Sequence, residues 1–167
     1  MTWFACDAPQ TIISAEFAGG TVRLGLTAAG RLQLVVGGRM VLETERPLLS
    51  RQWCMVAASC TPARAGTGAY NAPVPGKFTL LAAPAPYEWS ADARPAAELR
   101  TAAASSPQIT LNDPGSMGKP SVELGALLGV CVGATRVDGA LSDFFNGKVA
   151  GPGVYGAGKD LGLLVSE

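Results

Sequence analysis

Apolar and polar residues alternate along the stretch from Gly30 to Cys60, whose sequence is GRLQLVVGGRMVLETERPLLSRQWCMVAASC. Between Leu32 and Val36 large apolar residues recur at every second position, which is the period of a pleated strand. The pair Gly37-Gly38 then offers the positive φ angles that a two-residue hairpin turn requires. Because Met40 and Leu42 resume the alternation, the stretch predicts an antiparallel meander of strands joined by tight turns.

Short runs of the same kind predict strands elsewhere in the chain. They are Thr11 to Ala15, Thr21 to Leu26, Lys77 to Ala82, Ile109 to Leu111, Ser121 to Leu124 and Val130 to Ala134. Only Ala93 to Ala104 is compatible with a helix. Eight or more short strands with almost no helix favour an all-β fold, an antiparallel two-sheet β-sandwich of jelly-roll type, over a barrel. The strand phases further predict that Leu34, Trp53, Val56 and Leu80 are buried.

Chain length and two proline-rich stretches define the expected domain organisation. Residues 1–167 fit a single domain. The stretches at residues 61–76 and 84–107 are rich in proline and alanine and are expected to be loop insertions, which at this length are uncommon unless they are packed or functional. Since Met1 to Phe4 resembles the interior of a strand, we expect the chain to be a fragment of a larger protein.

Charge and composition exclude several classes of function. The 13 basic and 13 acidic residues cancel and form no basic cluster, so nucleic-acid binding is not expected. Membrane association is not expected either, because the apolar run from Leu124 to Ala134 is broken by glycine and is shorter than a bilayer span. The chain has no histidine, which excludes Ser-His-Asp and Cys-His catalytic groups and any His-containing zinc or iron site within it.

The four cysteines, Cys6, Cys54, Cys60 and Cys131, show no CxxC spacing. Cys54 and Cys60 are expected on one strand about 20 Å apart, which is beyond the reach of a disulfide. Pairing of Cys6 with Cys60 or with Cys131 stays open. The favoured interpretation is that the thiols are reduced and buried in a cytoplasmic protein.

The segment from Pro84 to Pro107 holds the candidate surface for a ligand or partner. It carries Tyr87 and Trp89 together with Arg94 and Arg100, and these residue types are enriched at protein interfaces. An aromatic face such as that of Trp89 also suits stacking on a sugar ring, so a glycan is the alternative ligand.

Two sets of carboxylates are candidates for chemistry, and each has a simpler explanation. Glu43 and Glu45 share one strand face, as a glycosidase pair would, but they adjoin a turn on an exposed rim. The residues Asn112-Asp113, Asp138 and Asp143 are oxygen ligands without the spacing of a calcium-binding loop. The sequence therefore predicts no catalytic residue and no metal site in this chain.

Several segments resemble the concanavalin A-like, laminin G-like β-sandwich family. GRLQLVVGG followed by PLLSRQWCMVAAS is similar to the family's strand, turn and strand followed by a strand with a Trp-x-x-Val-Ala pattern. FFNGKVAGPGVY is similar to a late hairpin, with Phe145, Gly147, Val149 and Tyr155 in register. PQTIISAEFAGGTVRLGLTAAGRL resembles the first hairpin.

A closer resemblance is to the laminin G-like domain within the large subunit of N,N-dimethylformamidase-type amidohydrolases. It rests on the Trp-x-x-Val-Ala-Ala-Ser pattern before a long loop, on FTLLAAPAPYEWSADARPAAELR, and on Phe145 to Lys148. In that family, hydrolysis takes place at a mononuclear iron that tyrosines and a glutamate hold in a separate domain. No Tyr/Tyr/Glu cluster is visible here, since Tyr70, Tyr87 and Tyr155 are scattered along the sequence.

The resemblance implies a non-catalytic structural or interaction domain that packs against another domain or subunit of a larger amidohydrolase. It implies no cofactor in this chain and an iron in the catalytic domain of the parent protein. A carbohydrate-binding module is the alternative. A small β-sandwich glycosidase comes last, because glucanases on this fold need paired glutamates with ExDxxE-like spacing and the sequence lacks that pattern.

Overall fold

A computed structural model of the chain describes residues 2–4, 7–61, 77–84, 98–103, 126–137 and 139–154. Within these residues every regular element is a β-strand and every strand pairing is antiparallel. The described residues include no helix long and apolar enough to cross a membrane. The strands are β1 Thr2–Phe4, β2 Gln10–Phe17, β3 Gly20–Leu26, β4 Arg31–Val36, β5 Arg39–Pro47, β6 Cys54–Thr61, β7 Lys77–Pro84, β8 Glu98–Ala103, β9 Leu127–Val132, β10 Thr135–Val137, β11 Ala140–Ser142 and β12 Gly147–Val149.

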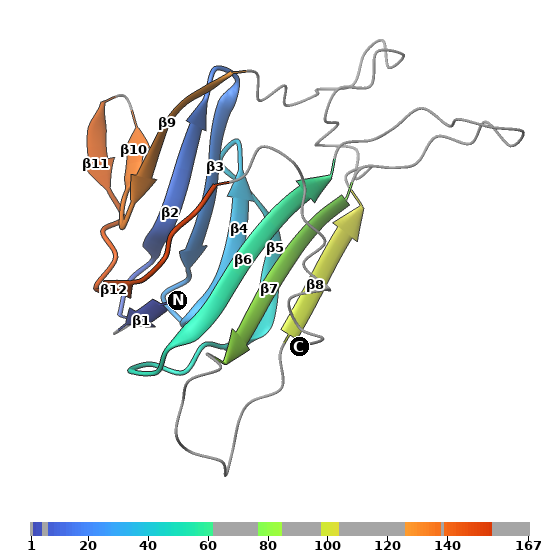
Figure 1. The fold of residues 1–167 in the computed structure, drawn as a ribbon, viewed down its shortest axis with the longest axis vertical. Helices are drawn as coiled ribbons and strands as arrows, with labels where there is room; N and C mark the ends of the chain where they lie inside the picture. Colours follow the sequence, from blue (N-terminus) through green and yellow to red (C-terminus); the bar gives the residue numbers. More distant parts are fainter. Residues whose placement is uncertain are drawn as a thin grey trace, which may run out of the picture.

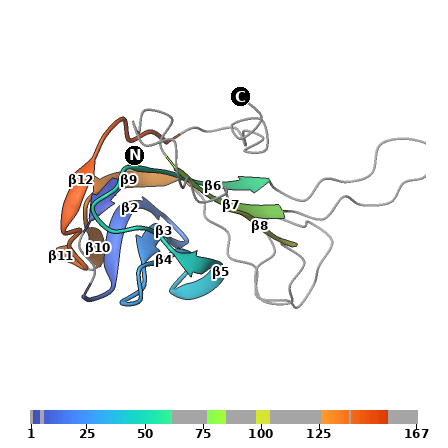
Figure 2. The same ribbon diagram turned by 90° about the horizontal axis from the view of Figure 1, so that it is seen from below.

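These strands form two five-stranded sheets and a separate two-stranded hairpin (Figure 1). One sheet has the order β5-β4-β3-β2-β9, the other has the order β12-β1-β6-β7-β8, and β10 and β11 form the hairpin. Figure 2 shows β6, β7 and β8 in a layer separate from β3, β4 and β5, with the β10–β11 hairpin at the opposite end of the molecule from β8. The predicted all-β fold with antiparallel sheets is confirmed, and two facing sheets are the arrangement of a β-sandwich.

The meander predicted between Gly30 and Cys60 is present in the first sheet. Gly37 and Gly38 form the turn between β4 and β5 with φ angles of 57° and 77°, which only glycine adopts at no steric cost. A bulge in the pairing of β4 with β5 then shifts the register, so Leu42 lies opposite Leu34 but Met40 lies opposite Val35. Met40 is therefore 58% exposed and does not continue the inward phase that the alternation predicts.

Gly25 in β3 marks a close approach between backbones. A Cβ atom at this position would lie 2.3 Å from the carbonyl oxygen of Gln10. The same place carries a bulge in the pairing of β2 with β3, between Thr11 and Ile13. Only a residue without a side chain allows the two strands to approach this closely.

One hydrophobic core lies between the two sheets. Leu32, Leu34 and Val36 of β4 enter it from the first sheet, and Phe78 and Leu80 of β7 enter it from the second. Each of these side chains is at most 2% exposed. Burial of one large apolar side chain stabilises the fold by about 1.5–3 kcal/mol, so this core is what holds the sheets face to face. The predicted burial of Leu34 and Leu80 is confirmed.

The predicted burial of Trp53 is wrong. Trp53 precedes β6 and is only partly buried, whereas Val56 packs against the core from β6 together with Ala58 and Cys60. Positions of odd number in β6 belong to the other face of the strand, where Met55 packs beside Leu81. Because side chains alternate between faces, Trp53 and Val56 cannot share the inward phase.

The helix expected from Ala93 to Ala104 is also wrong over its described part. Glu98–Ala103 forms β8 and pairs with β7, from Glu98 opposite Ala82 to Ala103 opposite Lys77. The segment has only a weak apolar face for a helix to bury, and the edge of β7 supplies backbone partners for a strand instead. The 84–107 insertion is thus not a pure loop, since it contributes an edge strand to the second sheet.

The later strands differ from the expected ones in position. The strand expected from Val130 to Ala134 is β9, which begins earlier and ends at Val132, and the β10–β11 hairpin that follows has no counterpart among the predicted strands. Near the expected late hairpin, Phe145 and Val149 pack against the core. The strands expected at 109–111 and 121–124, most of the 61–76 insertion, and Tyr155 lie outside the described residues.

Candidate functional site

Of the candidate surface residues between 84 and 107, the described part includes only Arg100. Tyr87, Trp89 and Arg94 lie outside it. On β8, the guanidinium of Arg100 forms an ion pair with the carboxylate of Glu45 on β5. Beside this pair, Glu98 accepts a hydrogen bond from the backbone N–H of Glu45 at 2.6 Å. In this structure Arg100 therefore helps to connect β8 of one sheet with β5 of the other.

The two candidate carboxylate sets do not form one reactive centre. Glu43 lies 3.9 Å from Arg31, and Glu45 faces Arg100, so each glutamate has an arginine of its own. Asp143, named as an oxygen ligand, forms an ion pair with Arg23. Asn112, Asp113 and Asp138 lie outside the described residues. Within the described part, no group of three or more Cys, Asp or Glu residues is placed to hold a metal ion.

Cys54, Cys60 and Cys131 form no disulfide within the described part of the chain. Cys60 packs against the core from β6, and desolvation by burial raises the pKa of its thiol from 9.0 to about 11. A thiol with a raised pKa is a poor nucleophile near neutral pH, because the thiolate is the reactive form. Cys60 therefore acts as a small core residue, as expected from the sequence.

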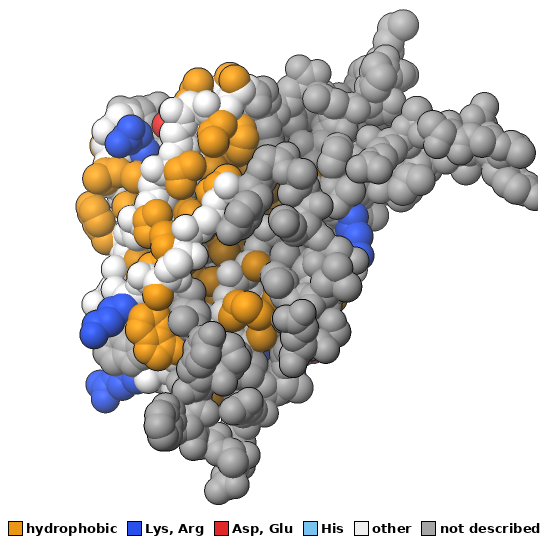
Figure 3. Space-filling model, in the orientation of Figure 1, with side chains coloured by type: hydrophobic (Ala, Val, Ile, Leu, Met, Phe, Trp, Pro, Cys, Tyr) orange, Lys and Arg blue, Asp and Glu red, His pale blue; other side chains and the backbone are white. Residues whose placement is uncertain are grey.

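An exposed apolar surface follows β9. Leu127, Leu128, Val130 and Val132 are 45–64% exposed. Figure 3 shows apolar side chains, in orange, gathered in the region of β9 and toward the β10–β11 hairpin. The hairpin and the residues after it add Val137, Leu141 and Phe144, which are also exposed. Contiguous apolar patches of this kind are characteristic of interaction sites.

The phase of β9 shows that part of this surface faces the core side of its sheet. Val132 lies opposite Ile13 and Val130 lies opposite Ala15 in β2. Ile13 packs against the core and Ala15 is buried, so Val130 and Val132 project from the same side of the sheet. The described contacts between the sheets are concentrated on β4 and β5 against β7 and β8, which leaves the inward face of β9 exposed.

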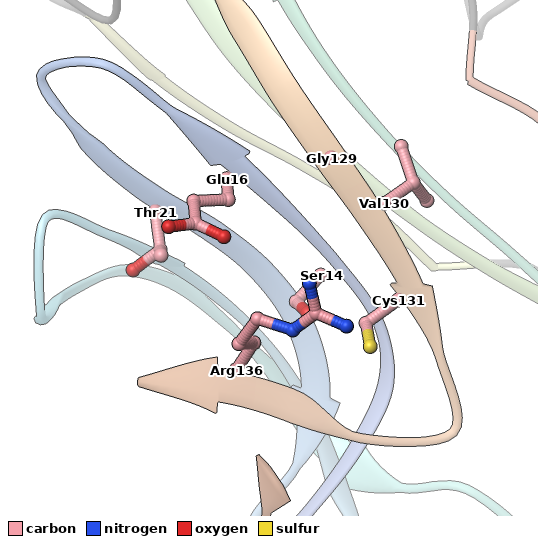
Figure 4. Close-up of a pocket in the computed structure, with 7 residues that line it drawn as sticks. All are labelled: Ser14, Glu16, Thr21, Gly129, Val130, Cys131 and Arg136. Atoms are coloured by element: carbon pink, nitrogen blue, oxygen red, sulfur yellow. The ribbon is translucent and has the colours of Figure 1, made fainter. Parts of the chain in front are cut away.

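A small polar pocket lies on the opposite face of β2 and β9 (Figure 4). It is lined by Ser14, Glu16, Thr21, Gly129, Val130, Cys131 and Arg136 and has a volume of about 50 Å³. In Figure 4 the Arg136 side chain reaches from β10 toward Ser14 and Cys131, while Glu16 lies farther along β2 near Thr21. A pocket of this size holds one or two water molecules, so it is too small for an organic substrate.

Hydrogen bonds hold the β10–β11 hairpin against β2. The hydroxyls of Thr11 and Thr135 lie 2.6 Å apart, and the Ser14 hydroxyl donates to the carbonyl of Ala134 at 2.9 Å. The backbone N–H of Thr11 donates to the carbonyl of Asp143 at 2.8 Å. Buried polar groups with such partners fix the hairpin in one position. Arg136 is thereby placed over the outer face of β9.

Comparisons with protein-family models, with curated proteins and with solved structures found no match to this chain. Sequence patterns did not indicate the β9 surface, although one signal was present: the run Leu127 to Val132 contains no charged residue and no proline. Such a run is unusual for a strand that ends up at the edge of a sheet.

Proposed function

We propose that this chain is a non-catalytic interaction domain, a laminin G-like β-sandwich of the concanavalin A-like jelly-roll type that presents a surface to another domain or subunit. We further propose that the larger protein is an N,N-dimethylformamidase-like amidohydrolase of the cytoplasm, whose iron lies in a separate catalytic domain. This chain would then supply neither the metal ligands nor the reacting groups.

The observation that carries the proposal is the exposed apolar surface along β9. Val130 and Val132 lie on the side of the sheet that forms the core, yet each is nearly half exposed. Exposed apolar surface on the core side of a sheet is favourable only when a partner covers it, because its hydration is costly. Glu43, Glu45 and Asp143, the described members of the candidate carboxylate sets, are each paired with an arginine, which suits a structural role for them.

Co-expression with the rest of its reading frame, or with the polypeptides encoded beside it, tests the proposal. We expect the chain to co-purify with an iron-containing hydrolase, and we expect Val130→Lys to abolish this association while the matched outward substitution Met40→Lys leaves it intact. Dimethylformamide hydrolysis should require the partner. Hydrolysis by the isolated chain, lost when one of its own carboxylates or tyrosines is replaced, would contradict the proposal.

A further inference from the structure

We propose that β9 pairs with β9 of a second copy of this chain, so that two five-stranded sheets join into one ten-stranded sheet across a two-fold axis. This inference rests on the proposed interaction function and concerns the edge of β9, whereas the proposed contact with the hydrolase uses the inward face of the same strand. It follows from three features of β9: its free edge, its apolar inward face, and the charges that flank its outward face.

The free edge of β9 is suited to pairing with another strand. Among the described strands, β9 pairs only with β2 and ends the sheet. Natural edge strands are usually protected by lysine, proline or an inward-pointing charge, and Leu127 to Val132 has none of these. Addition of a strand at such an edge satisfies backbone N–H and C=O groups along its length.

The inward face of β9 is complementary to itself in an antiparallel pairing centred on Val130. In this register Val130 faces the partner's Val130. Leu128, which lies at a bulge of β9 between Leu127 and Gly129, is at the level of the partner's Val132. All three cross-strand pairs on this face are then apolar, which is a stabilising combination. The same pairing makes the two inward faces continuous, so the exposed side chains of the two copies pack against one another along the junction.

The outward face fits the same register. Gly129 faces the partner's Cys131, so only small side chains meet there. On β2, Glu16 lies beside Gly129 and Ser14 lies beside Cys131. In this structure the Glu16 side chain lies near Thr21 (Figure 4). Because Gly129 has no side chain, a change of rotamer lets the Glu16 carboxylate extend over Gly129 toward the partner's strand. Two strand spacings, about 10 Å, separate the backbone of Glu16 from that of the partner's Cys131, the residue beside which the partner's Arg136 lies.

The charges at this position are complementary between copies. Arg136 lines the pocket with Ser14 and Cys131, so the partner's Arg136 lies at the level that Glu16 approaches. Neither Glu16 nor Arg136 forms an ion pair with another described residue. The two-fold axis therefore creates two Glu16–Arg136 pairs, one on each side of the junction, and gives both charges a partner.

Neighbouring registers lack this complementarity. An axis at Gly129 would place Glu16 at the level of the partner's Glu16, and an axis at Cys131 would place the two Arg136 side chains at one level. Like charges brought together across an interface disfavour association. The apolar face alone tolerates several registers, so the charges select the one centred on Val130.

Disulfide cross-linking tests the register directly. A Cβ atom at Gly129 would meet nothing within 4 Å, so Gly129→Cys is tolerated by the fold. In the proposed dimer the introduced thiol lies opposite the partner's Cys131, and we expect oxidised glutathione to produce a covalent dimer on a non-reducing gel. Adding Cys131→Ser should abolish the covalent dimer. A cross-link that survives this substitution, or none at all, would overturn the register.

Charge exchange tests the pairing independently, by sedimentation equilibrium across the micromolar range. We expect Glu16→Arg or Arg136→Glu to raise the dissociation constant at least about tenfold, and the double variant to restore it to within a few-fold. Arg39→Glu, an exposed charge on the opposite edge strand β5, is the matched control and should have no effect. Circular dichroism melting curves establish that each variant is folded.

The outcomes separate this inference from the proposed function. A chain that is monomeric at all concentrations, or a dimer indifferent to both charge reversals, overturns the β9–β9 pairing. Suppose that the chain is monomeric but that Val130→Lys still abolishes its co-purification with the hydrolase. The proposed interaction function then stands, and a strand of another protein occupies the edge of β9. If the charge exchange behaves as expected but Val130→Lys leaves co-purification intact, the dimer stands and the proposed contact with the hydrolase fails.

Discussion

Substitution of Leu80 by alanine tests whether the two sheets share one core. Leu80 lies on β7, has 0% exposure, and packs with Leu34 and its neighbours from the facing sheet. Leu→Ala substitutions at fully buried positions cost about 2.7–5 kcal/mol, depending on how far the cavity collapses. Rigid strands on both sides leave little room for collapse, so we expect Leu80→Ala to lower the free energy of unfolding by about 3–4 kcal/mol.

The matched control is Leu99→Ala on the neighbouring strand β8. Leu99 lies opposite Leu81 in the pairing of β7 with β8 and is 44% exposed, so its loss should cost less than about 1 kcal/mol. For a domain of this size, 1 kcal/mol corresponds to a shift of about 2–4 °C in melting temperature. Urea unfolding and thermal melting should therefore separate the two variants clearly. Equal destabilisation by both would show that the assigned strand phases, and hence the shared core, are incorrect.

Three further predictions concern particular sites. Gly25→Ala should destabilise the fold by more than about 2 kcal/mol, because its Cβ would lie 2.3 Å from a backbone oxygen. Gly129→Ala, whose Cβ would have nothing within 4 Å, should be nearly neutral. Equal urea midpoints for the two variants would contradict this prediction. Thr11→Val should lower the free energy of unfolding by about 1–2 kcal/mol in the same assay, because it leaves the buried hydroxyl of Thr135 without its partner. An unchanged urea midpoint would show that this hydrogen bond is not formed. The folded chain holds the Cys60 proton up to about pH 11, while the unfolded chain releases it near pH 9. The free energy of unfolding should therefore fall by up to about 2 kcal/mol as the pH rises from 9 to 11. Cys60→Ala should flatten this decline, and an equal decline in both proteins would refute the assignment.

The first sheet could be predicted from the sequence because its signals are local. The alternation of Leu32, Leu34 and Val36, and the turn at Gly37-Gly38, depend on neighbouring residues alone. The predictions that proved wrong concern features that depend on tertiary contacts. The strand β8 forms where the 98–103 segment meets the edge of β7, and the phase of β6 depends on where the strand begins, a boundary that local patterns define poorly. A one-residue error in such a boundary exchanges the two faces of a strand.

For the candidate site too, local sequence signals indicated some residues, while others depend on the tertiary structure. The sequence directed attention to aromatic and charged residues between 84 and 107, of which Arg100 is described and connects β8 to Glu45. The apolar surface of β9 could not be predicted, because its exposure depends on which strand ends the sheet. Only the sheet order β5-β4-β3-β2-β9 reveals that an uncharged run, Leu127 to Val132, forms an edge.

Hydrogen–deuterium exchange of β9 tests most directly whether this edge is an interaction surface. The measurement compares residues 127–132 with residues 31–36 of the central strand β4, in the dilute chain and in its assembly. In the dilute chain we expect the β9 amides that face the free edge to exchange rapidly while the β4 amides stay protected. In the assembly the same β9 amides should become at least about tenfold slower, with β4 unchanged, because backbone pairing is what protects them. Protection of β9 equal to that of β4 in the dilute chain, or exchange of β9 that assembly leaves unchanged, would contradict the proposed role of this domain.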